Sequence, residues 1–544
     1  MTAIEAEAAG EAALTEPTVT AVAADAVGRD RTVAVVGTGT MGQGIAQVAL
    51  VAGHRVRLYD ALPGRAEEAA GAIAARLDRL VAKGRMDPAA RDAARERLHS
   101  AAGLDDLADA ALVVEAVVER LDAKQELFTA LEKTVSDGCL LATNTSSLSV
   151  TAIAGALRVP GRFVGLHFFN PAPLLPLVEV VSGFATDEQA AVRAYETAKA
   201  WGKTPVRCAD TPGFIVNRVA RPFYAEALRI HEERGADPAT IDAVLRESGG
   251  FRMGPFELTD LIGQDVNEAV TRSVWESFHQ DPKFTPSLAQ RRLVESGRLG
   301  RKTGRGWFSY AEGATPPEPR TAPPAEAPRK ITVRGDLGPA NSLVGLFEEA
   351  GLTVRRKSGA GYITLPGGAR LCLADGETSA EYYGQEIIYF DLALDYARAT
   401  RIALSADAET VSSESLREAI GLFQAVGKQV SVIGDVPGMI VARTVAMLAD
   451  VAADAVARGV ASEEDIDIAM RLGVNYPAGP LEWASAVGFQ RICDMLGELH
   501  TRYPTGRYAP SLGTVRRACG ENGRKRERGE RAESAENAGS GDSR

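Results

Sequence analysis

The sequence predicts an α/β protein in which a parallel, helix-covered sheet is followed by an all-helical domain, with a degenerate second copy of both. Three observations lead to this prediction. A glycine-rich turn joins a β-branched run to a helical stretch near residue 37, helical periodicity takes over after residue 209, and the later pattern recurs at a constant offset of 225 residues. Alternating strand and helix patterns are typical of doubly wound α/β folds.

Length and composition limit the classes of protein. A chain of 544 residues is too long for one core and divides into several domains. Its net charge of −11 argues against a nucleic-acid partner, and no apolar run reaches the roughly 18–20 residues of a membrane span. The five cysteines are scattered singly without a CxxC pair, which is typical of reduced thiols in the cytoplasm and indicates no metal site.

The first element is a strand–turn–helix, RTVAVVGTGTMGQG, at residues 31–44. Gly37 allows the tight turn, Gly39 lets the backbone approach a pyrophosphate, and Gly42 lets the helix pack closely on the strand. Asp60 ends the next strand pattern, 23 residues after Gly37, where a carboxylate accepts hydrogen bonds from an adenosine ribose and repels a 2′-phosphate. These residues predict a Rossmann-type domain that binds NAD rather than NADP; the alternative is a glycine turn without a ligand.

Two further strand patterns follow, at residues 111–119 and 139–148, and each ends in polar residues. Ligands of open parallel sheets bind at the carboxyl ends of the strands. We therefore expect Glu119, Asn144 and Ser146 to line the cofactor crevice.

One histidine and one carboxylate stand in the apolar run LHFFNPAPLLPLVE at residues 166–179. His167 alone would be read as a core histidine with satisfied nitrogens, and Glu179 lies in a strand pattern where a carboxylate is unusual. Together they suggest a dyad, because a hydride leaves a carbinol carbon only when a base removes the hydroxyl proton. A buried carboxylate on the second ring nitrogen fixes the tautomer and stabilises the imidazolium.

Five motifs, in this order and spacing, resemble the L-3-hydroxyacyl-CoA dehydrogenases: GTGTMGQGIA, EAVVE, NTSSL, GLHFFNPAPLLPLVEVV and DTPGFIVNR. The resemblance covers about residues 31–310. It implies oxidation of a (3S)-3-hydroxyacyl-CoA to the 3-oxoacyl thioester with NAD as cofactor.

The resemblance also implies roles for individual residues. His167 would be the base and Glu179 its partner, while Ser146 would contact the 3-oxygen of the substrate and Asn217 the reacting region of the thioester. The cofactor site would comprise Gly37, Gly39, Thr40, Met41, Gly42, Asp60, Glu119, Lys124, Asn144, Ser146, Asn170 and Lys302.

The second half repeats the first. GKTPVRCADTPGFIVNR (202–218) aligns with GKQVSVIGDVPGMIVAR (427–443), and GPFE (254–257) with GPLE (479–482), both at an offset of 225. The expected pieces are a disordered leader (1–30), the NAD-binding domain (31–209), a helical substrate domain (210–312), a proline-rich exposed linker (313–330), a degenerate Rossmann-like domain (331–434), a second helical domain (435–518) and a disordered tail (519–544).

The second copy has lost the groups that the chemistry needs. Asp336 puts a negative charge where a pyrophosphate would lie, Arg355 or Arg356 falls near the position of Asp60, and Ala442 replaces Asn217. QEIIYFDLALDYA stands where the first copy has HFFNP. We therefore expect no hydride transfer in this half. Because single-copy relatives associate through their helical domains, the second helical domain is expected to pack on the first in place of a partner subunit.

The two-copy arrangement most resembles the 3-hydroxyacyl-CoA dehydrogenases of bacterial phenylacetate breakdown, which implies 3-hydroxyadipyl-CoA as substrate. A terminal carboxylate would require a cation, and Arg218, Arg221 and Arg252 are candidates that the sequence does not separate. Two alternatives remain open: a short-chain 3-hydroxybutyryl-CoA dehydrogenase of general fatty-acid metabolism, and a non-catalytic NAD-binding structural protein. The expected partners are a CoA thioester and either a second copy in a homodimer or an intramolecular pseudo-dimer, with neither nucleic acid nor membrane.

Overall fold

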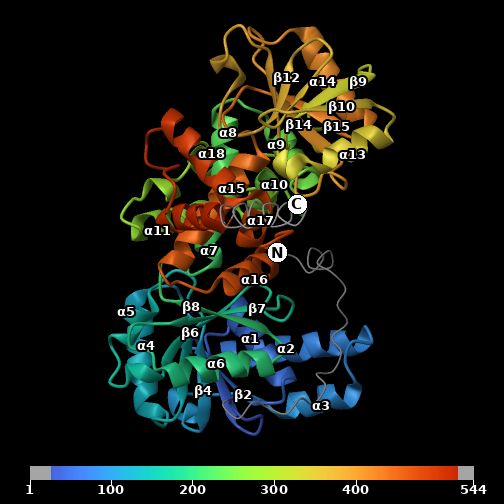
Figure 1. The fold of residues 1–544 in the computed structure, drawn as a ribbon. Coiled ribbons are helices and arrows are strands. Elements are labelled where there is room, and N and C mark those ends of the chain that lie inside the picture. Colours follow the sequence, from blue (N-terminus) through green and yellow to red (C-terminus); the bar gives the residue numbers. More distant parts are fainter. Residues whose placement is uncertain (1–25, 525–544) are drawn as a thin grey trace, which may run out of the picture. The chain divides into compact units, whose positions relative to one another are not determined.

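The computed structural model describes residues 26–524, which divide into two compact units (Figure 1). The first comprises the chain up to Phe214 together with Val460–Asp465. The second comprises Ile215–Gly459 and the chain from Ile466 onward. The expected leader and tail lie outside the described residues where they cover 1–25 and 525–544.

Both terminal predictions extend too far into the fold. Val27 is buried, and its N–H donates to Thr197 Oγ1 at 3.0 Å, so residues 26–30 belong to the first unit. At the other end residues 512–524 are helical. Glu521 accepts a hydrogen bond from the N–H of Phe489 at 3.0 Å and so caps a helix. The polar composition of these segments concealed the few side chains that anchor them.

The first unit contains an eight-stranded sheet with the order β3-β2-β1-β4-β5-β6-β7-β8. The β6–β7 pair is antiparallel and the other pairs are parallel. Its strands are β1 (Thr32–Val36), β2 (Arg55–Tyr59), β3 (Leu98–Ser100), β4 (Ala110–Glu115), β5 (Leu140–Thr143), β6 (Phe163–Phe168), β7 (Leu177–Ser182) and β8 (Thr204–Ala209). Its helices are α1 (Thr40–Val51), α2 (Arg65–Ala82), α3 (Pro88–Glu96), α4 (Leu121–Thr134), α5 (Val150–Ala154) and α6 (Glu188–Ala200).

The strand predicted over residues 111–119 ends early, at Glu115. The Glu115 carboxylate accepts hydrogen bonds from the N–H of Val117 at 2.6 Å and from Thr143 Oγ1 at 2.7 Å. The chain therefore turns where the apolar pattern alone would continue the strand. This ends β4 beside the carboxyl ends of β1 and β5.

The second unit combines the helices of both copies with a second sheet. The first-copy helices are α7 (Val216–Val219), α8 (Arg221–Glu232), α9 (Pro238–Glu247), α10 (Pro255–Ile262), α11 (Gln264–Ser277) and α12 (Leu288–Glu295). The second-copy helices are α15 (Val441–Ala457), α16 (Glu463–Val474), α17 (Pro480–Val487) and α18 (Phe489–Arg502). In Figure 1 the green α8 lies beside α15, and the two helices are in contact.

The two helical copies share local structure as well as sequence. Asp242 accepts hydrogen bonds from the N–H groups of Phe256 and Glu257, each at 2.9 Å. Asp467 does the same for Leu481 and Glu482, again at 2.9 Å and at an offset of 225 residues. Duplication therefore extends to the contact that fixes the start of a helix.

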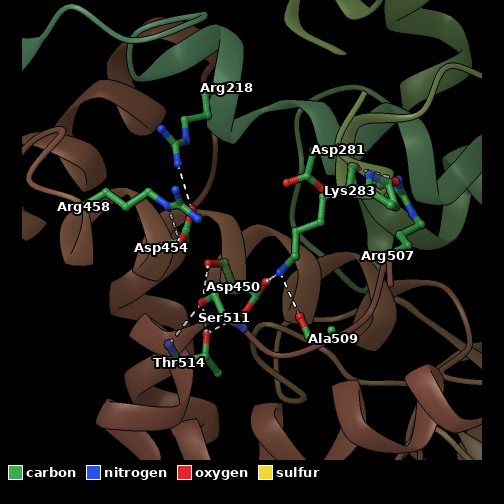
Figure 2. Close-up of polar contacts among 11 residues, drawn as sticks. Arg218, Asp281, Lys283, Asp450, Asp454, Arg458, Arg507, Ala509, Ser511 and Thr514 are labelled. Carbon is green, nitrogen blue, oxygen red and sulfur yellow. Dashed lines mark hydrogen bonds and ion pairs between the residues drawn. The ribbon is translucent and has the colours of Figure 1, made fainter. Parts of the chain in front are cut away.

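Ion pairs and buried polar contacts join the two helical copies. Arg218 of α7 forms an ion pair with Asp454 of α15 at 2.8 Å, and Lys283 forms one with Asp450 (Figure 2). Both acidic residues lie on the second-copy helix, and Asp450 also accepts hydrogen bonds from Ser511 and Thr514. Basic side chains of the first copy thus pair with acidic side chains of the second copy.

A second, fully buried cluster lies on α8. Glu226 accepts hydrogen bonds from Arg443 Nε at 3.0 Å, Arg507 Nε at 3.1 Å and the Tyr508 hydroxyl at 2.8 Å. Arg443 also reaches Glu233 at 2.7 Å. Burial alone would raise the pKa of Glu226, but the charges of Arg507 and Arg443 outweigh it and lower that pKa to about 2.

The proline-rich segment is exposed over much of its length, as predicted, but it is not a free linker. The N–H of Ala322 donates to the Val430 carbonyl at 2.7 Å, and Ser431 Oγ donates to the Arg320 carbonyl at 2.7 Å. The N–H of Arg320 donates to Thr240 Oγ1 at 2.9 Å. An edge strand presents unpaired backbone groups, and the non-proline residues of this segment satisfy some of them.

The second sheet has the order β10-β9-β11-β12-β13-β14-β15. Its strands are β9 (Lys330–Arg334), β10 (Thr353–Lys357), β11 (Tyr362–Thr364), β12 (Arg370–Leu373), β13 (Ile387–Phe390), β14 (Arg401–Ser405) and β15 (Gln429–Ile433), with helices α13 (Ser342–Glu349) and α14 (Ser413–Ala425). In residues 26–524 no helix is long and apolar enough to cross a membrane.

The nucleotide turn of the second copy is altered in the way the sequence predicts, with one correction. Asp336 accepts hydrogen bonds from the N–H of Gly338 at 2.7 Å and from the Asn341 amide, so its charge occupies the start of the helical segment. The residue at the position of Asp60 is Ser358, not Arg355 or Arg356. In each copy the N–H of the turn glycine donates to the last carbonyl of the neighbouring strand, and Ser358 follows that carbonyl.

Candidate active site

His167 and Glu179 form a direct, buried pair in the first unit. They lie opposite each other on the antiparallel strands β6 and β7. His167 Nδ1 and Glu179 Oε2 are 2.6 Å apart, and both residues are buried. The rings of Phe169 and Phe214 lie 4.5 and 5.8 Å from the imidazole ring, so the pair is flanked by apolar groups. Low polarity strengthens the interaction between an imidazolium and its carboxylate.

The glycine turn has the geometry that each glycine is expected to supply. Gly37 has φ +93°, and a Cβ at Gly42 would lie 1.8 Å from the Gly37 carbonyl oxygen, so α1 packs directly on the turn. A Cβ at Gly39 would meet no atom of the described chain within 4 Å. The space over Gly39 and the first turn of α1, with Thr40 and Met41, therefore remains open for a ligand. This cradle fits a pyrophosphate at a helix N-terminus.

Asp60 lies beside this turn, at the end of β2. Its Oδ2 accepts hydrogen bonds from the N–H of Thr38 at 2.9 Å and from Thr38 Oγ1 at 2.8 Å, and its Oδ1 accepts from the N–H of Leu62 at 3.1 Å. Partial burial would raise the pKa of Asp60, but these hydrogen bonds lower it overall. The carboxylate is therefore charged and held in place at neutral pH. The glycine motif did not predict that Thr38 would hold Asp60 in place.

Glu119 and Lys124 belong to one polar network at the end of β4. Lys124 is 1% exposed and pairs with Glu115 at 2.6 Å and with Glu119 at 3.2 Å. Glu119 also accepts hydrogen bonds from the N–H of Ser146 at 3.0 Å and from Thr145 Oγ1 at 2.6 Å. Burial would raise the pKa of Glu119, but the Thr145 hydroxyl and the Lys124 charge lower it. Lys124 therefore fixes Glu119, while Glu119 fixes the Ser146 loop.

The remaining first-unit residues lie at the same edge of the sheet. Asn144 follows β5 and accepts a hydrogen bond from the N–H of Phe168 at 2.8 Å, which ties it to the end of the His167 strand. Ser146 and Asn170 are exposed. Lys203, which the sequence analysis missed, donates to the carbonyls of Ala172 at 2.6 Å and Leu175 at 2.9 Å and so holds the loop after Asn170.

Two of the predicted site residues belong to the second unit. Asn217 lies in the first turn of α7 and is half-buried. Lys302 forms an ion pair with Asp265, whose two oxygens lie 2.5 and 2.7 Å from Nζ.

Strand register identifies what the second copy has at the positions of the dyad. His167 faces Glu179, which in turn faces Val206 on β8. In the second sheet the N–H of Asp391 donates to the Ala403 carbonyl, and Ala403 faces Ser431, which aligns with Val206 at the offset of 225. Asp391 and Ala403 thus occupy the places of His167 and Glu179.

Asp391 caps a helix. It accepts hydrogen bonds from the N–H groups of Ile440 at 3.1 Å, Val441 at 2.8 Å and Ala442 at 3.0 Å, which open α15. The second copy therefore has a helix-capping aspartate at the position of His167.

Family models agree with this architecture. The 3-hydroxyacyl-CoA dehydrogenase NAD binding domain matches residues 32–211, and the C-terminal domain of the same family matches twice, at 213–310 and 438–531. The reduced Rossmann-fold domain of 3-hydroxybutyryl-CoA dehydrogenase matches residues 371–437. The chain belongs to the 3-hydroxyacyl-CoA dehydrogenase family, whose members are NAD-dependent dehydrogenases, and the predicted resemblance, α/β fold and cofactor are confirmed.

Individual relatives show how much of the chain is shared. The 3-hydroxyadipyl-CoA dehydrogenase of Escherichia coli K12 is 44% identical over 91% of this chain and 98% of its own. A crystal structure described as 3-hydroxybutyryl-CoA dehydrogenase from E. coli K12 covers 91% of this chain and 99% of its own, with a TM-score of 0.83 and 43% identity. The mitochondrial hydroxyacyl-coenzyme A dehydrogenase of Sus scrofa is 42% identical over 51% of this chain and 90% of its own. A single-copy enzyme therefore corresponds to about half of this chain.

Proposed function

We propose that this chain oxidises (3S)-3-hydroxyadipyl-CoA to the 3-oxoadipyl thioester with NAD, with His167 as general base and Glu179 as its charge partner. The observation that supports the reaction is the buried His167–Glu179 pair in the same sheet as the open glycine turn. The substrate rests on the E. coli 3-hydroxyadipyl-CoA dehydrogenase, which matches nearly the whole chain. The short-chain and the non-catalytic alternatives become outcomes of the test below.

The proposed mechanism assigns one task to each group. Glu179 accepts a hydrogen bond from the Nδ1–H of His167, which leaves Nε2 with a lone pair for the hydroxyl proton of the substrate. The glycine turn and Asp60 would hold NAD, which would supply the hydride acceptor for C3. Ser146 contacts the 3-oxygen and Asn217 the thioester region. Asp60 and Glu119 act at the cofactor, and Lys124 acts by holding Glu119 ionised and in place.

We further propose that the second helical copy acts as a built-in partner subunit. Its support is the set of ion pairs that join α7 and α8 to the second copy, including the Glu226 cluster. The second sheet, with Asp391 and Ala403 in place of the dyad, carries no dehydrogenase chemistry. The cytoplasm is the proposed location, in keeping with the cysteines, which are free thiols in the described chain.

The test is NADH formation by the purified chain, followed at 340 nm, with (3S)-3-hydroxybutyryl-CoA and 3-hydroxyadipyl-CoA side by side. Higher kcat/KM with the adipyl thioester is expected. Preference for the butyryl thioester would leave the reaction intact and assign the chain to short-chain metabolism. If neither thioester reacted, a non-catalytic NAD-binding role would stand instead.

Replacing Glu179 by glutamine tests the dyad while preserving its shape. We expect Glu179→Gln to lower kcat by a factor on the order of 10²–10⁴, because a neutral amide neither fixes the tautomer nor stabilises the imidazolium. The dissociation constant of NAD, measured by fluorescence titration, should stay within about twofold of wild type. A variant with wild-type kcat would mean that Glu179 only fills space in the sheet.

A further inference from the structure

Arg221 is a buried cation without an anionic partner in the described chain. It opens α8 and is 6% exposed. Its Nη1 lies 3.2 Å from Thr271 Oγ1, and its guanidinium lies 4.9 Å from the centre of the Tyr224 ring. Its Nε is buried without a hydrogen-bond partner, and no carboxylate of residues 26–524 forms an ion pair with it. A single hydroxyl and one ring leave most of its charge uncompensated.

The other two candidate arginines differ from Arg221. Arg218 is also buried, but Asp454 pairs with it at 2.8 Å. Arg252 is exposed to solvent. A buried arginine cannot lose its charge, because its pKa lies far above neutrality. A buried arginine without an anionic partner therefore makes the ligand-free protein less stable. An incoming carboxylate would remove this penalty.

The second copy places an unpaired hydroxyl beside this arginine. Tyr476 is buried, and its hydroxyl has no hydrogen-bond partner in the described chain. Its ring lies 5.6 Å from that of Phe223 on α8 and 5.0 Å from that of Phe251. Burial lowers the pKa of Arg221, and the phenol groups that oppose this shift are those of Tyr224 and Tyr476, with no carboxylate among them. Phe251 is the first-copy equivalent of Tyr476 at the offset of 225, so the hydroxyl is an addition of the second copy.

The duplication relates Arg221 and Asn217 to two residues that share one cavity. The second-copy equivalent of Arg221 is Ala446, and that of Asn217 is Ala442. Ala442 and Ala446 line one small cavity in the second copy. Asn217 and Arg221 are four residues apart, about one helical turn or 6 Å along the axis. That length is on the scale of the five carbon–carbon bonds between the thioester carbon, which is assigned to Asn217, and the terminal carboxyl carbon of a hydroxyadipyl chain.

We propose that Arg221, assisted by the Tyr476 hydroxyl, binds the terminal carboxylate of a dicarboxylic acyl-CoA and so determines the acyl specificity of the enzyme. The guanidinium offers a planar pair of donors that matches a carboxylate, and burial makes that pairing strong. A methyl-terminated chain leaves both donors unpaired and is disfavoured for that reason. The inference rests on the proposed dehydrogenase function and assigns part of the acyl site to the second copy.

The experiment compares 3-hydroxyadipyl-CoA with (3S)-3-hydroxyhexanoyl-CoA, which has the same six-carbon chain without the carboxylate. The readout is the ratio of the two kcat/KM values. We expect Arg221→Met to lower this ratio by about 100-fold, mostly through KM for the adipyl thioester, and Tyr476→Phe to lower it by about tenfold. Arg221→Lys should retain part of the preference, and Arg252→Met, the exposed control, should retain all of it.

Thermal stability separates specificity from a structural role. Removing an unpaired buried charge should raise the Tm of Arg221→Met above wild type, whereas losing a structural contact would lower it. An unchanged ratio in Arg221→Met, or equal losses on both thioesters with a lower Tm, would overturn the inference. If the wild-type protein oxidised both thioesters equally well, the role of Arg221 in specificity would be overturned, while the proposed dehydrogenase reaction would stand. Wild type inactive on both would reject the proposed function itself.

Discussion

Replacing His167 by glutamine is expected to lower kcat by a factor on the order of 10³–10⁴, with little change in NAD binding. Glutamine fills a similar volume and can still donate to Glu179, which lies 2.6 Å from the imidazole nitrogen, so the fold should be retained. It cannot take up the hydroxyl proton of the substrate at neutral pH. Proton transfer by a positioned base contributes about 10²–10⁴-fold, and the low polarity around His167 favours the upper part of that range.

Stopped-flow measurement of NADH formation and fluorescence titration of NAD check this prediction together. The matched control is His99→Gln, because His99 is exposed on the edge strand β3 and should tolerate the change. The double variant His167→Gln with Glu179→Gln should be no slower than His167→Gln by more than about twofold, since residues that act as a unit are not additive. Wild-type turnover in His167→Gln would reject the dyad.

The largest expected effect on stability follows from removing the charge of Glu226. Glu226→Gln leaves the guanidinium groups of Arg443 and Arg507 buried beside a neutral amide. Breaking a buried ion cluster by removing one partner costs about 3–5 kcal/mol. Urea unfolding followed by tryptophan fluorescence would measure the change in the free energy of unfolding.

Glu348→Gln is the control, because Glu348 forms an exposed pair with Arg356 at 3.1 Å and should change stability by less than about 1 kcal/mol. Equal effects of the two substitutions would show that the cluster contributes nothing specific. Glu226→Gln should also weaken the packing of the first helical copy against the second, so limited proteolysis should cut the variant faster between the copies.

The low pKa of the Glu226 carboxylate predicts that the free energy of unfolding depends on pH. The pKa of Glu226 is about 2 in the folded chain against 4.5 for an ordinary glutamate. A depressed pKa stabilises the folded state above the unfolded value, so this contribution is complete above pH 4.5 and disappears as pH falls toward 2. Wild type should therefore lose stability more steeply than Glu226→Gln between pH 4.5 and 2. Parallel curves for the two proteins would contradict the low pKa.

The sequence alone predicted the fold of the first half well, because its signals are local. The turn at Gly37 needs only the residues beside it, and the contacts of Gly42 follow from a strand that runs directly into a helix. His167 and Glu179 are twelve positions apart and meet across one hairpin-like pair of strands. The duplication was visible because equal offsets persist in the residues that begin helices, such as Asp242 and Asp467.

The terminal and linker segments were less predictable from composition. Val27 and Glu521 tie polar stretches to distant elements, and Arg320 ties the proline-rich segment to Ser431 of β15. A single anchoring hydrogen bond hardly changes the local composition, so a compositional reading assigns such a stretch to disorder or to a free linker.

Only the tertiary structure decided which charged groups have partners. Arg218 and Asp454 are 236 positions apart and meet because α15 packs beside α7, while Arg221, three residues after Arg218, meets no carboxylate in the described chain. Asp391 proved to occupy the place of His167 only through strand register, since the two segments share no motif. The physical reason is the range of the interactions: covalent neighbours determine a turn or a helix start, whereas burial and pairing depend on which distant segments meet.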